Sequence, residues 1–310
     1  MNSLWPWIIF IVFVLALLAL DLGVFNRRPH VLRFREAAGW SVFWVALSLA
    51  FNLGIYWRCG AEAALQFLTG YLLEKSLSAD NVFLFAVIFA SMGVAAEYQH
   101  RVLFWGVLGA LITRGVFIIA GVELVRHFHA ILYLFAVFIL FMGVRLLFGQ
   151  GKKYDPASSR VTGLARRLFP ISDRYEGGRF FTRCGGRLCA TPLLLVLILI
   201  EVADVTFALD SIPAIFGVTQ DAFIIFTSNV LAILGLRALY FLLARALSRF
   251  RYLHAALAVI LIFIGVRMLS ARWVHIPTGF ALLGILLILG IAILVSLLTA
   301  ISHHAGQGER

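Results

Sequence analysis

Long runs of apolar residues, separated by short polar segments, dominate the pattern along the chain. Most runs have about the twenty residues that a helix needs to cross a hydrocarbon core roughly 30 Å thick. Because lipid cannot satisfy backbone amides, and because the runs are too long and too uniformly apolar for barrel strands, they predict α-helices. The sequence therefore predicts an all-α polytopic membrane protein, one transmembrane domain over 1–310, with nine spans at 4–25, 37–57, 63–96, 102–122, 128–148, 191–213, 222–246, 252–270 and 277–301.

The direction of the spans follows from the basic residues in the loops. The loop 149–190 carries nine basic residues against three acidic ones, and the loops 26–36 and 245–251 are also basic. With nine spans these three loops lie on one side, and the alternate loops are nearly balanced in charge. The positive-inside rule then predicts an N-terminus outside, a cytoplasmic C-terminus and a basic cytoplasmic loop at 149–190.

Composition agrees with this class and excludes others. Of the 310 residues 62% are hydrophobic and only 13% are charged, whereas a soluble domain has about a quarter charged. The formal net charge of +11 is explained by the cytoplasmic loops, so no nucleic-acid partner is predicted. An enzyme is not predicted either, because no nucleophile–base pair or phosphate-binding loop is present. The three cysteines form no CxxC pair.

Two polar stretches interrupt the apolar pattern and resemble each other. They are "EKSLSADNVF" at 74–83 and "EVADVTFALDSIP" at 201–213, and their alignment pairs Glu74 with Asp204, Asp80 with Asp210 and Asn81 with Ser211. Further along, "FMGVRLL" at 141–147 nearly repeats as "FIGVRML" at 263–269, and Arg114 aligns beside Arg237. Spans three to five (63–148) thus match spans six to eight (191–270). A unit of three spans enters the membrane from opposite sides in its two copies, so the repeats are predicted to be inverted, as in many transporters.

Both polar stretches are predicted to disturb their helices. The run 63–96 is too long for one straight crossing, so either its outer part lies in the membrane interface or the helix is interrupted, with "EKSLSADN" as the expected place of the interruption. In the second stretch Pro213 removes a backbone donor, so a kink is expected near Asp210.

Ionisable residues inside a membrane usually face the bundle interior and mark an ion or proton path. Oxygen ligands without Cys or His indicate a hard cation such as Mn²⁺, Mg²⁺ or Ca²⁺. As an alternative, basic residues could neutralise the acids in purely structural ion pairs. Five acids less three bases leave a formal excess of two negative charges, which suits one divalent cation or two protons. The candidate cation ligands are Glu74, Asp80, Asn81, Glu201, Asp204, Asp210 and Ser211, and the charge-balancing residues are Arg114, Arg237 and Lys75. Asp21 either joins the path or caps a helix.

The segments "EKSLSADNVF" and "EVADVTFALDSIPAIF" resemble the signature segments of the TerC family of bacterial integral membrane proteins. The stretch "ATPLLLVLILIEVADVTFALDSIPAIFGVT" is similar to the Alx branch of that family. The resemblance implies a plasma-membrane protein, in a family with members proposed to export Mn²⁺ and others linked to tellurite resistance. It also implies that Glu74, Asp80, Glu201, Asp204 and Asp210 are functional residues. A redox role, also attached to the Alx branch, finds little support in the residues, which contain no flavin fingerprint and no haem-ligating His pair within spans.

Two functions remain after the sequence is read. The first is a secondary transporter that moves Mn²⁺ out of the cytoplasm in exchange for protons, with no permanently bound cofactor. The second is a non-transporting membrane scaffold or redox-linked stress protein, whose basic loop 149–190 docks soluble partners or anionic lipid. The sequence identifies no protein partner.

Overall fold

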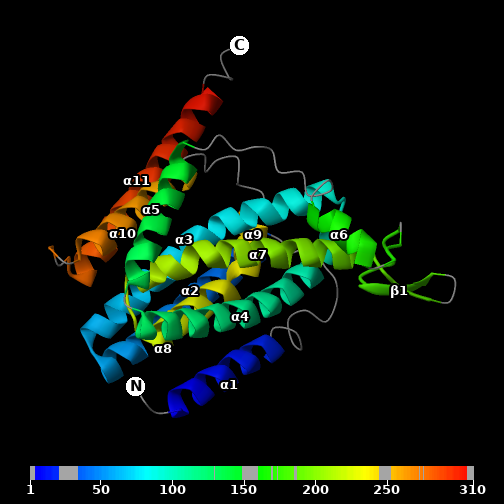
Figure 1. The fold of residues 1–310 in the computed structure, drawn as a ribbon. Coiled ribbons are helices and arrows are strands. Elements are labelled where there is room, and N and C mark those ends of the chain that lie inside the picture. The colour runs from blue at the N-terminus through cyan, green and yellow to red at the C-terminus, as the bar shows by residue number, and fades with distance from the viewer. Residues whose placement is uncertain are drawn as a thin grey trace.

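The computed structural model of the chain is helical almost throughout (Figure 1). It describes residues 4–20, 34–128, 130–148, 160–168, 170–172, 174–184, 187–243, 253–271, 273–274 and 276–305. Asp21 and the loop 245–251 lie outside the described residues, as do parts of the loops 26–36 and 149–190. The elements are α1 (Trp5–Leu20), α2 (Phe34–Cys59), α3 (Ala61–Ser91), α4 (Ala96–His127), α5 (Ile131–Phe148), α6 (Arg160–Leu168), β1 (Phe181–Cys184), β2 (Arg187–Ala190), α7 (Pro192–Phe216), α8 (Ala222–Leu234), α9 (Leu236–Leu243), α10 (Leu253–Ser270) and α11 (Thr278–Ala305).

Each predicted apolar segment is occupied by a helix or by the helix pair α8–α9. Among the described residues, five helices are long and apolar enough to cross a membrane by themselves, namely α2, α4, α5, α7 and α11. The pair α8–α9 adds a sixth if it is counted as one span, while α1 and α10 are shorter apolar helices. The all-α polytopic class is therefore confirmed, and the number of nine spans stays a prediction.

The helices form a central bundle with a second group lying across it. α3 and α7 pack against each other, α8 packs against α3, α4 packs against α7, and α4 and α8 also contact each other. α5, α10 and α11 run together along one side of the bundle, steeply inclined to α3, α4 and α7 (Figure 1). The polar stretches of α3 and α7 thus lie in the middle of the molecule, where neighbouring helices cover them.

The interruption predicted in the third apolar run is wrong, because α3 continues from Ala61 to Ser91. Three of its polar side chains have bonds that leave the helix intact. Ser76 donates to the carbonyl of Leu72 one turn earlier at 2.6 Å, and Glu74 and Lys75 bond to other helices. A helix of this length reaches about 46 Å at 1.5 Å per residue. It therefore extends beyond the apolar thickness of a bilayer.

A bend that the sequence did not predict lies between α8 and α9, which are bent by 42° at Gly235. Helix α7 continues through Pro213 and ends at Phe216, and the kink expected near Asp210 stays a prediction. The ammonium of Lys75 would lie only 2.6 Å from a Cβ at Gly235, so a glycine at the bend leaves room for the lysine.

The segment predicted as a basic loop contains described structure. After α6, the strands β1 and β2 form an antiparallel hairpin in which Thr182 is opposite Cys189. The hydroxyl of Tyr175 donates to the carbonyl of Met92 at 2.6 Å, which ties this segment to the end of α3. A two-stranded sheet therefore supplements the all-α prediction.

α5 and α10 pack through a reciprocal pair of glycines. A Cβ at Gly143 of α5 would lie 3.0 Å from the carbonyl oxygen of Ala258 and 2.9 Å from the amide nitrogen of Ile262. A Cβ at Gly265 of α10 would lie 3.1 Å from the carbonyl oxygen of Ala136 and 3.0 Å from the amide nitrogen of Leu140. Each glycine thus meets the backbone of the partner helix, which is the close approach that small residues permit in membrane helices.

We expect Gly143→Ala to lower the melting temperature of the purified protein. The new methyl group meets backbone atoms of α10, which cannot move away as a flexible side chain could. Overpacking of this kind costs about 1–3 kcal/mol. Gly39→Ala is the matched control, since a Cβ there has no atom within 4 Å. Equal melting temperatures for the two variants would show that the close helix contact does not stabilise the fold.

Candidate functional site

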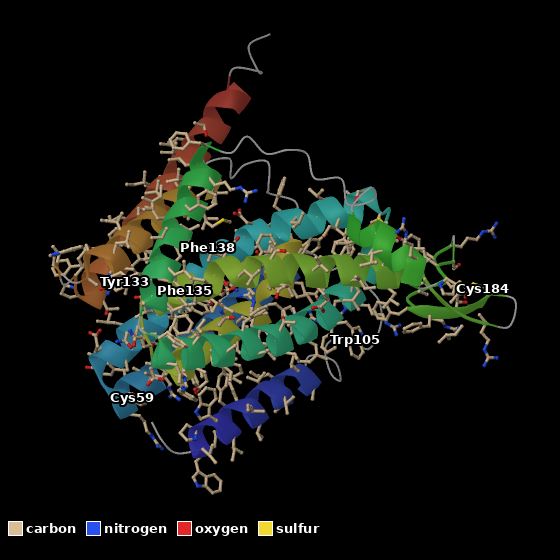
Figure 2. The ribbon with its side chains drawn as sticks, in the orientation of Figure 1. Cys59, Trp105, Tyr133, Phe135, Phe138 and Cys184 are labelled. Carbon is tan, nitrogen blue, oxygen red and sulfur yellow. The ribbon has the colours of Figure 1, made fainter. Side chains whose placement is uncertain are left out.

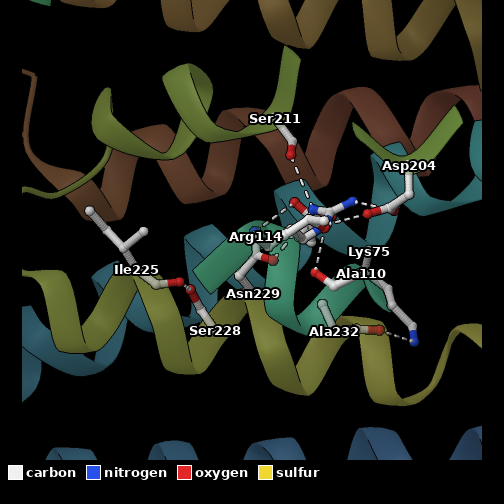
Figure 3. Close-up of polar contacts among 11 residues, drawn as sticks. Lys75, Ala110, Arg114, Asp204, Ser211, Ile225, Ser228, Asn229 and Ala232 are labelled. Atoms are coloured by element: carbon white, nitrogen blue, oxygen red, sulfur yellow. Dashed lines mark hydrogen bonds and ion pairs between the residues drawn. The ribbon is translucent and has the colours of Figure 1, made fainter. Parts of the chain in front are cut away.

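A buried arginine lies at the centre of the bundle. Arg114 of α4 is 1% exposed, and its guanidinium contacts residues of α3, α7 and α8 (Figure 3). Its Nη2 donates to Oδ1 of Asp204 at 3.1 Å, and its Nε donates to Oδ2 of the same carboxylate at 3.4 Å. Its Nη1 forms an ion pair with Oε1 of Glu74. One arginine therefore joins the two acids that the sequence alignment pairs.

Two neutral side chains complete this polar cluster. Nη1 of Arg114 also donates to Oγ of Ser211 at 3.1 Å and to Oδ1 of Asn229 at 3.3 Å. Nδ2 of Asn229 in turn donates to Oε2 of Glu74 at 3.0 Å. All five residues are buried. Hydrogen bonds to the ionised groups offset the loss of water around them, which is what makes charges tolerable in a bundle interior.

Asn229 was not among the residues predicted from the sequence, although a signal was present. It ends the polar trio Thr227, Ser228 and Asn229 inside an apolar run. Thr227 and Ser228 donate back to carbonyls of their own helix, at 2.7 and 3.1 Å, so neither reaches another helix through those bonds. Asn229 has the longer side chain and two kinds of polar atom, and it bridges an acid and a base.

A cavity of about 100 Å³ adjoins the polar cluster and is enclosed by α3, α4, α5, α7 and α10. Both members of two repeat-related pairs line it, namely Asp80 with Asp210 and Asn81 with Ser211. Asn81 is 1% exposed, and its side-chain oxygen accepts no hydrogen bond from the described residues. The other lining residues are Glu74, Leu77, Arg114, Met142, Leu146, Phe207 and Leu261. The lining of the cavity thus combines acids, an arginine and amide or hydroxyl groups with apolar side chains.

Asp80 and Asp210 reach the cavity from two different helices. Each lies one position before Asn81 or Ser211, about 100° away around its helix. Because α3 and α7 pack against each other, both aspartates line the same cavity. Both are half-buried, whereas Glu74 and Asp204 are fully buried.

Glu201 and Lys75 are directed toward other helices. A Cβ at Gly109 of α4 would collide with the carboxylate of Glu201, so this glycine makes room for the acid. Glu201 lies one helical turn before Asp204 and does not line the cavity. The ammonium of Lys75 donates to the carbonyl of Ala232 at 3.3 Å. That carbonyl belongs to the last turn of α8, where a positive charge is favourable.

The remaining predicted charge-balancing residue, Arg237, lies in α9 two positions after Gly235. Arg145 near the end of α5 is a charged neighbour of Asp210. In the described part of the chain no three His, Cys, Asp or Glu side chains are grouped closely enough to hold a metal ion. A cation in the cavity would therefore need amide and hydroxyl oxygens beside the two aspartates.

These features define an integral membrane protein of several apolar helices, with ionisable residues gathered around a cavity inside the bundle. Residues 59–306 match the family described as "Integral membrane protein TerC family", which is most of the chain. The protein belongs to the TerC family, so the resemblance noted in the sequence is confirmed.

Relatives match over nearly the whole length. A protein of Myxococcus xanthus described as "Uncharacterized membrane protein STKORF319" is 50% identical over 98% of this chain and 94% of its own. A protein of Photorhabdus laumondii described as "Putative membrane-bound redox modulator Alx" is 46% identical over 94% of this chain and 93% of its own. A protein of Escherichia coli strain K12 with the same description is 44% identical over 98% of this chain and 97% of its own. No solved structure matches the chain.

Proposed function

We propose that this protein is a secondary transporter that exports a hard divalent cation, with Mn²⁺ as the first candidate, in exchange for protons. The observation that carries the proposal is the cavity between α3 and α7, which is lined by Asp80, Asp210 and the amide of Asn81. Carboxylate and amide oxygens suit hard cations. The buried amide oxygen of Asn81 accepts no hydrogen bond from the described residues, so it can serve as a ligand.

Charge supports a cation over an anion at this place. Asp210 has Arg145 as a charged neighbour, and Glu74 lies beside both Arg114 and Lys75. The acids Glu74, Asp80, Glu201, Asp204 and Asp210 exceed the three predicted charge-balancing bases, Lys75, Arg114 and Arg237, by two, and Arg145 beside Asp210 reduces this formal excess to one negative charge. The balance stays negative, which favours a cation over an anion. Because bound metal requires ionised carboxylates, cation and protons compete for the same groups, which couples transport to pH.

We further propose that the chain is built from two inverted halves, 63–148 and 191–270. The reciprocal glycine contacts of α5 and α10 support this. The contacted residues correspond as Ala136 with Ala258 and Leu140 with Ile262, at the same spacing that relates Gly143 to Gly265. A two-fold relation between the halves generates contacts of this reciprocal kind. In transporters with inverted repeats the binding site lies between the halves, near the middle of the membrane.

The orientation can be tested with the native cysteines. Cys59, at the end of α2, and Cys184, on β1, lie at opposite ends of the molecule (Figure 2). With the N-terminus outside, an impermeant thiol reagent added to intact cells should label Cys59 and leave Cys184 and Cys189 unlabelled. After the cells are permeabilised, the reagent should also label Cys184. Labelling of Cys184 in intact cells would reverse the orientation.

The decisive test of function is transport by the purified protein. Reconstituted vesicles loaded with Mn²⁺ should lose the metal faster than protein-free vesicles and should take up protons as they do so. In cells, deletion of the protein should raise total Mn. If the protein moves no Mn²⁺, Mg²⁺ or Ca²⁺ across vesicles under any proton gradient, the transporter proposal is rejected.

The printed description of the Alx relatives favours a second candidate, a redox-linked membrane protein. Such a protein would change the thiol balance of cells whether or not Mn²⁺ crosses the membrane. Vesicle flux separates the two candidates, because a redox protein without transport leaves vesicle Mn²⁺ at the protein-free rate.

A further inference from the structure

A second and larger cavity lies at the C-terminal end of α7. It has a volume of about 510 Å³ and reaches the loop after α7 and the segment after α10. Thr219 donates to Oε1 of Gln66 at 2.6 Å on its wall, and Gln220 is exposed. In the proposed orientation this end of α7 faces the outside, so we name this cavity the outer vestibule. The other lining residues are Leu132, Tyr133, Phe216, Gly217, Val218, Arg267, Met268, Ala271, Val274 and Ile276.

An apolar cluster extends from the outer vestibule to the central cavity. Its members come from α3, α5, α7 and α10 and are Leu77, Ile139, Leu146, Ala214, Leu261 and Met268. Leu77, Leu146 and Leu261 line the central cavity, whereas Met268 lines the vestibule. We name this cluster the plug. A layer of this composition offers no ligand to a cation, so it obstructs an ion between the two spaces.

The side chain of Met268 packs against the end of α7. A Cβ at Gly217 would lie 2.7 Å from its Sδ, 2.9 Å from its Cγ and 2.8 Å from Cγ2 of Ile264, so the glycine allows both side chains of α10 to pack against the helix end. The preceding residue, Arg267, donates to the carbonyl of Gly217 at 3.0 Å and to that of Ile276 at 3.1 Å. The arginine thereby fixes α10 to the end of α7, while the unbranched methionine next to it has free torsions with which to move.

The two halves differ at this position. Met268 aligns with Leu146 of the first repeat, and both belong to the plug. Leu146 lines the central cavity directly, but Met268 does not. If the halves are inverted copies, equivalent residues lie toward opposite sides of the membrane. A difference between them therefore indicates that the path is closed toward one side, which here is the outer side.

We propose that Met268 is the outer gate of the cation path and that its displacement from Gly217 joins the outer vestibule to the central cavity. This inference rests on the proposed transport function, because it concerns the path to the same cavity. It names the residue that decides when the cavity faces outward.

Cysteine accessibility tests the gate without measuring transport. In full-length protein with Cys59→Ser, Gln220→Cys reports the vestibule and the nearly isosteric Ser211→Cys reports the central cavity. A cationic, impermeant methanethiosulfonate reagent is added to intact cells, and the modification rate is followed. Gln220→Cys should react rapidly and Ser211→Cys slowly. Met268→Ala should accelerate the Ser211→Cys reaction by roughly tenfold or more, because it removes packed contacts that hold the path closed.

Two further variants make the outcome specific. Gly217→Ala, whose φ of −70° is compatible with alanine, should displace Met268 and also accelerate the reaction. Met92→Ala is the matched control, because Met92 is also half-buried but lines neither the central cavity nor the vestibule, and the rate should not change. The gate is rejected if Ser211→Cys is already as reactive as Gln220→Cys, or if it stays slow with both Met268→Ala and Gly217→Ala. It is also rejected if Gln220→Cys does not react from outside. Failure of Mn²⁺ transport would leave these rates unaffected, so the two proposals can fail separately.

Discussion

Arg114→Ala should strongly reduce the amount of folded protein in the membrane. The substitution leaves Glu74 and Asp204 buried, 3% and 2% exposed, without the cation that both contact. Removing one partner of a buried ion pair costs about 3–5 kcal/mol, because an uncompensated charge remains in a medium of low dielectric constant. Ser211 and Asn229 also lose the donor that they share. The amount of membrane-inserted protein and its melting temperature in detergent measure the effect.

Compensating variants show whether charge is the cause. Arg114→Lys keeps the charge but loses the planar fork that bonds two carboxylates, so intermediate stability is expected. Arg114→Met combined with Glu74→Gln and Asp204→Asn leaves no net charge and should recover much of the folded protein. If Arg114→Ala inserts and melts normally while only the ion preference changes, the arginine selects the ion rather than holding the helices together.

The hydrophobic pattern predicted where helices occur, because the length and hydrophobicity of a run depend on that run alone. It failed in α3, where the polar residues 74–81 suggested an interruption. The two charged side chains at the start of this stretch find partners on other helices, Glu74 with Arg114 and Lys75 with the carbonyl of Ala232. Such contacts depend on tertiary packing, which a hydropathy profile does not include. The profile therefore treats these polar residues as incompatible with a continuous span. The bend at Gly235 escaped prediction for the same reason.

The candidate site was partly predictable because acidic residues recur at aligned positions in the two repeats. The alignment selected Glu74 and Asp204 together, and the structure joins them through Arg114. Asn229 has no aligned acid and enters the cluster only through the rotation of α8 against α3, which no local pattern specifies. Glu201 was grouped with Asp204 from helical spacing. The close packing of Gly109 directs it toward α4 instead of the cavity.

The combined variant Asp80→Asn, Asp210→Asn should reduce Mn²⁺ flux in reconstituted vesicles to the rate of protein-free vesicles. The two aspartates line the cavity, one from each proposed half. Asparagine keeps the size and one oxygen of each side chain, so the shape of the cavity is preserved while two negative charges are lost. A divalent cation then lacks both its counter-charge and the groups that exchange protons with it. Membrane insertion should remain intact, because neutralising acids within a span lowers the cost of burying them.

Proton movement and a matched acid outside the cavity make this test specific. Wild-type protein should couple Mn²⁺ efflux to proton uptake, and the double variant should lose both fluxes together. Glu123→Gln is the control, since Glu123 is 53% exposed at the end of α4 and pairs with Arg126 on the surface. It removes one negative charge from the same protein and should leave the flux unchanged. Mn²⁺ flux at the wild-type rate in the double variant would exclude these aspartates as cation ligands, because a transported ion cannot pass a site from which both charged ligands have been removed without slowing.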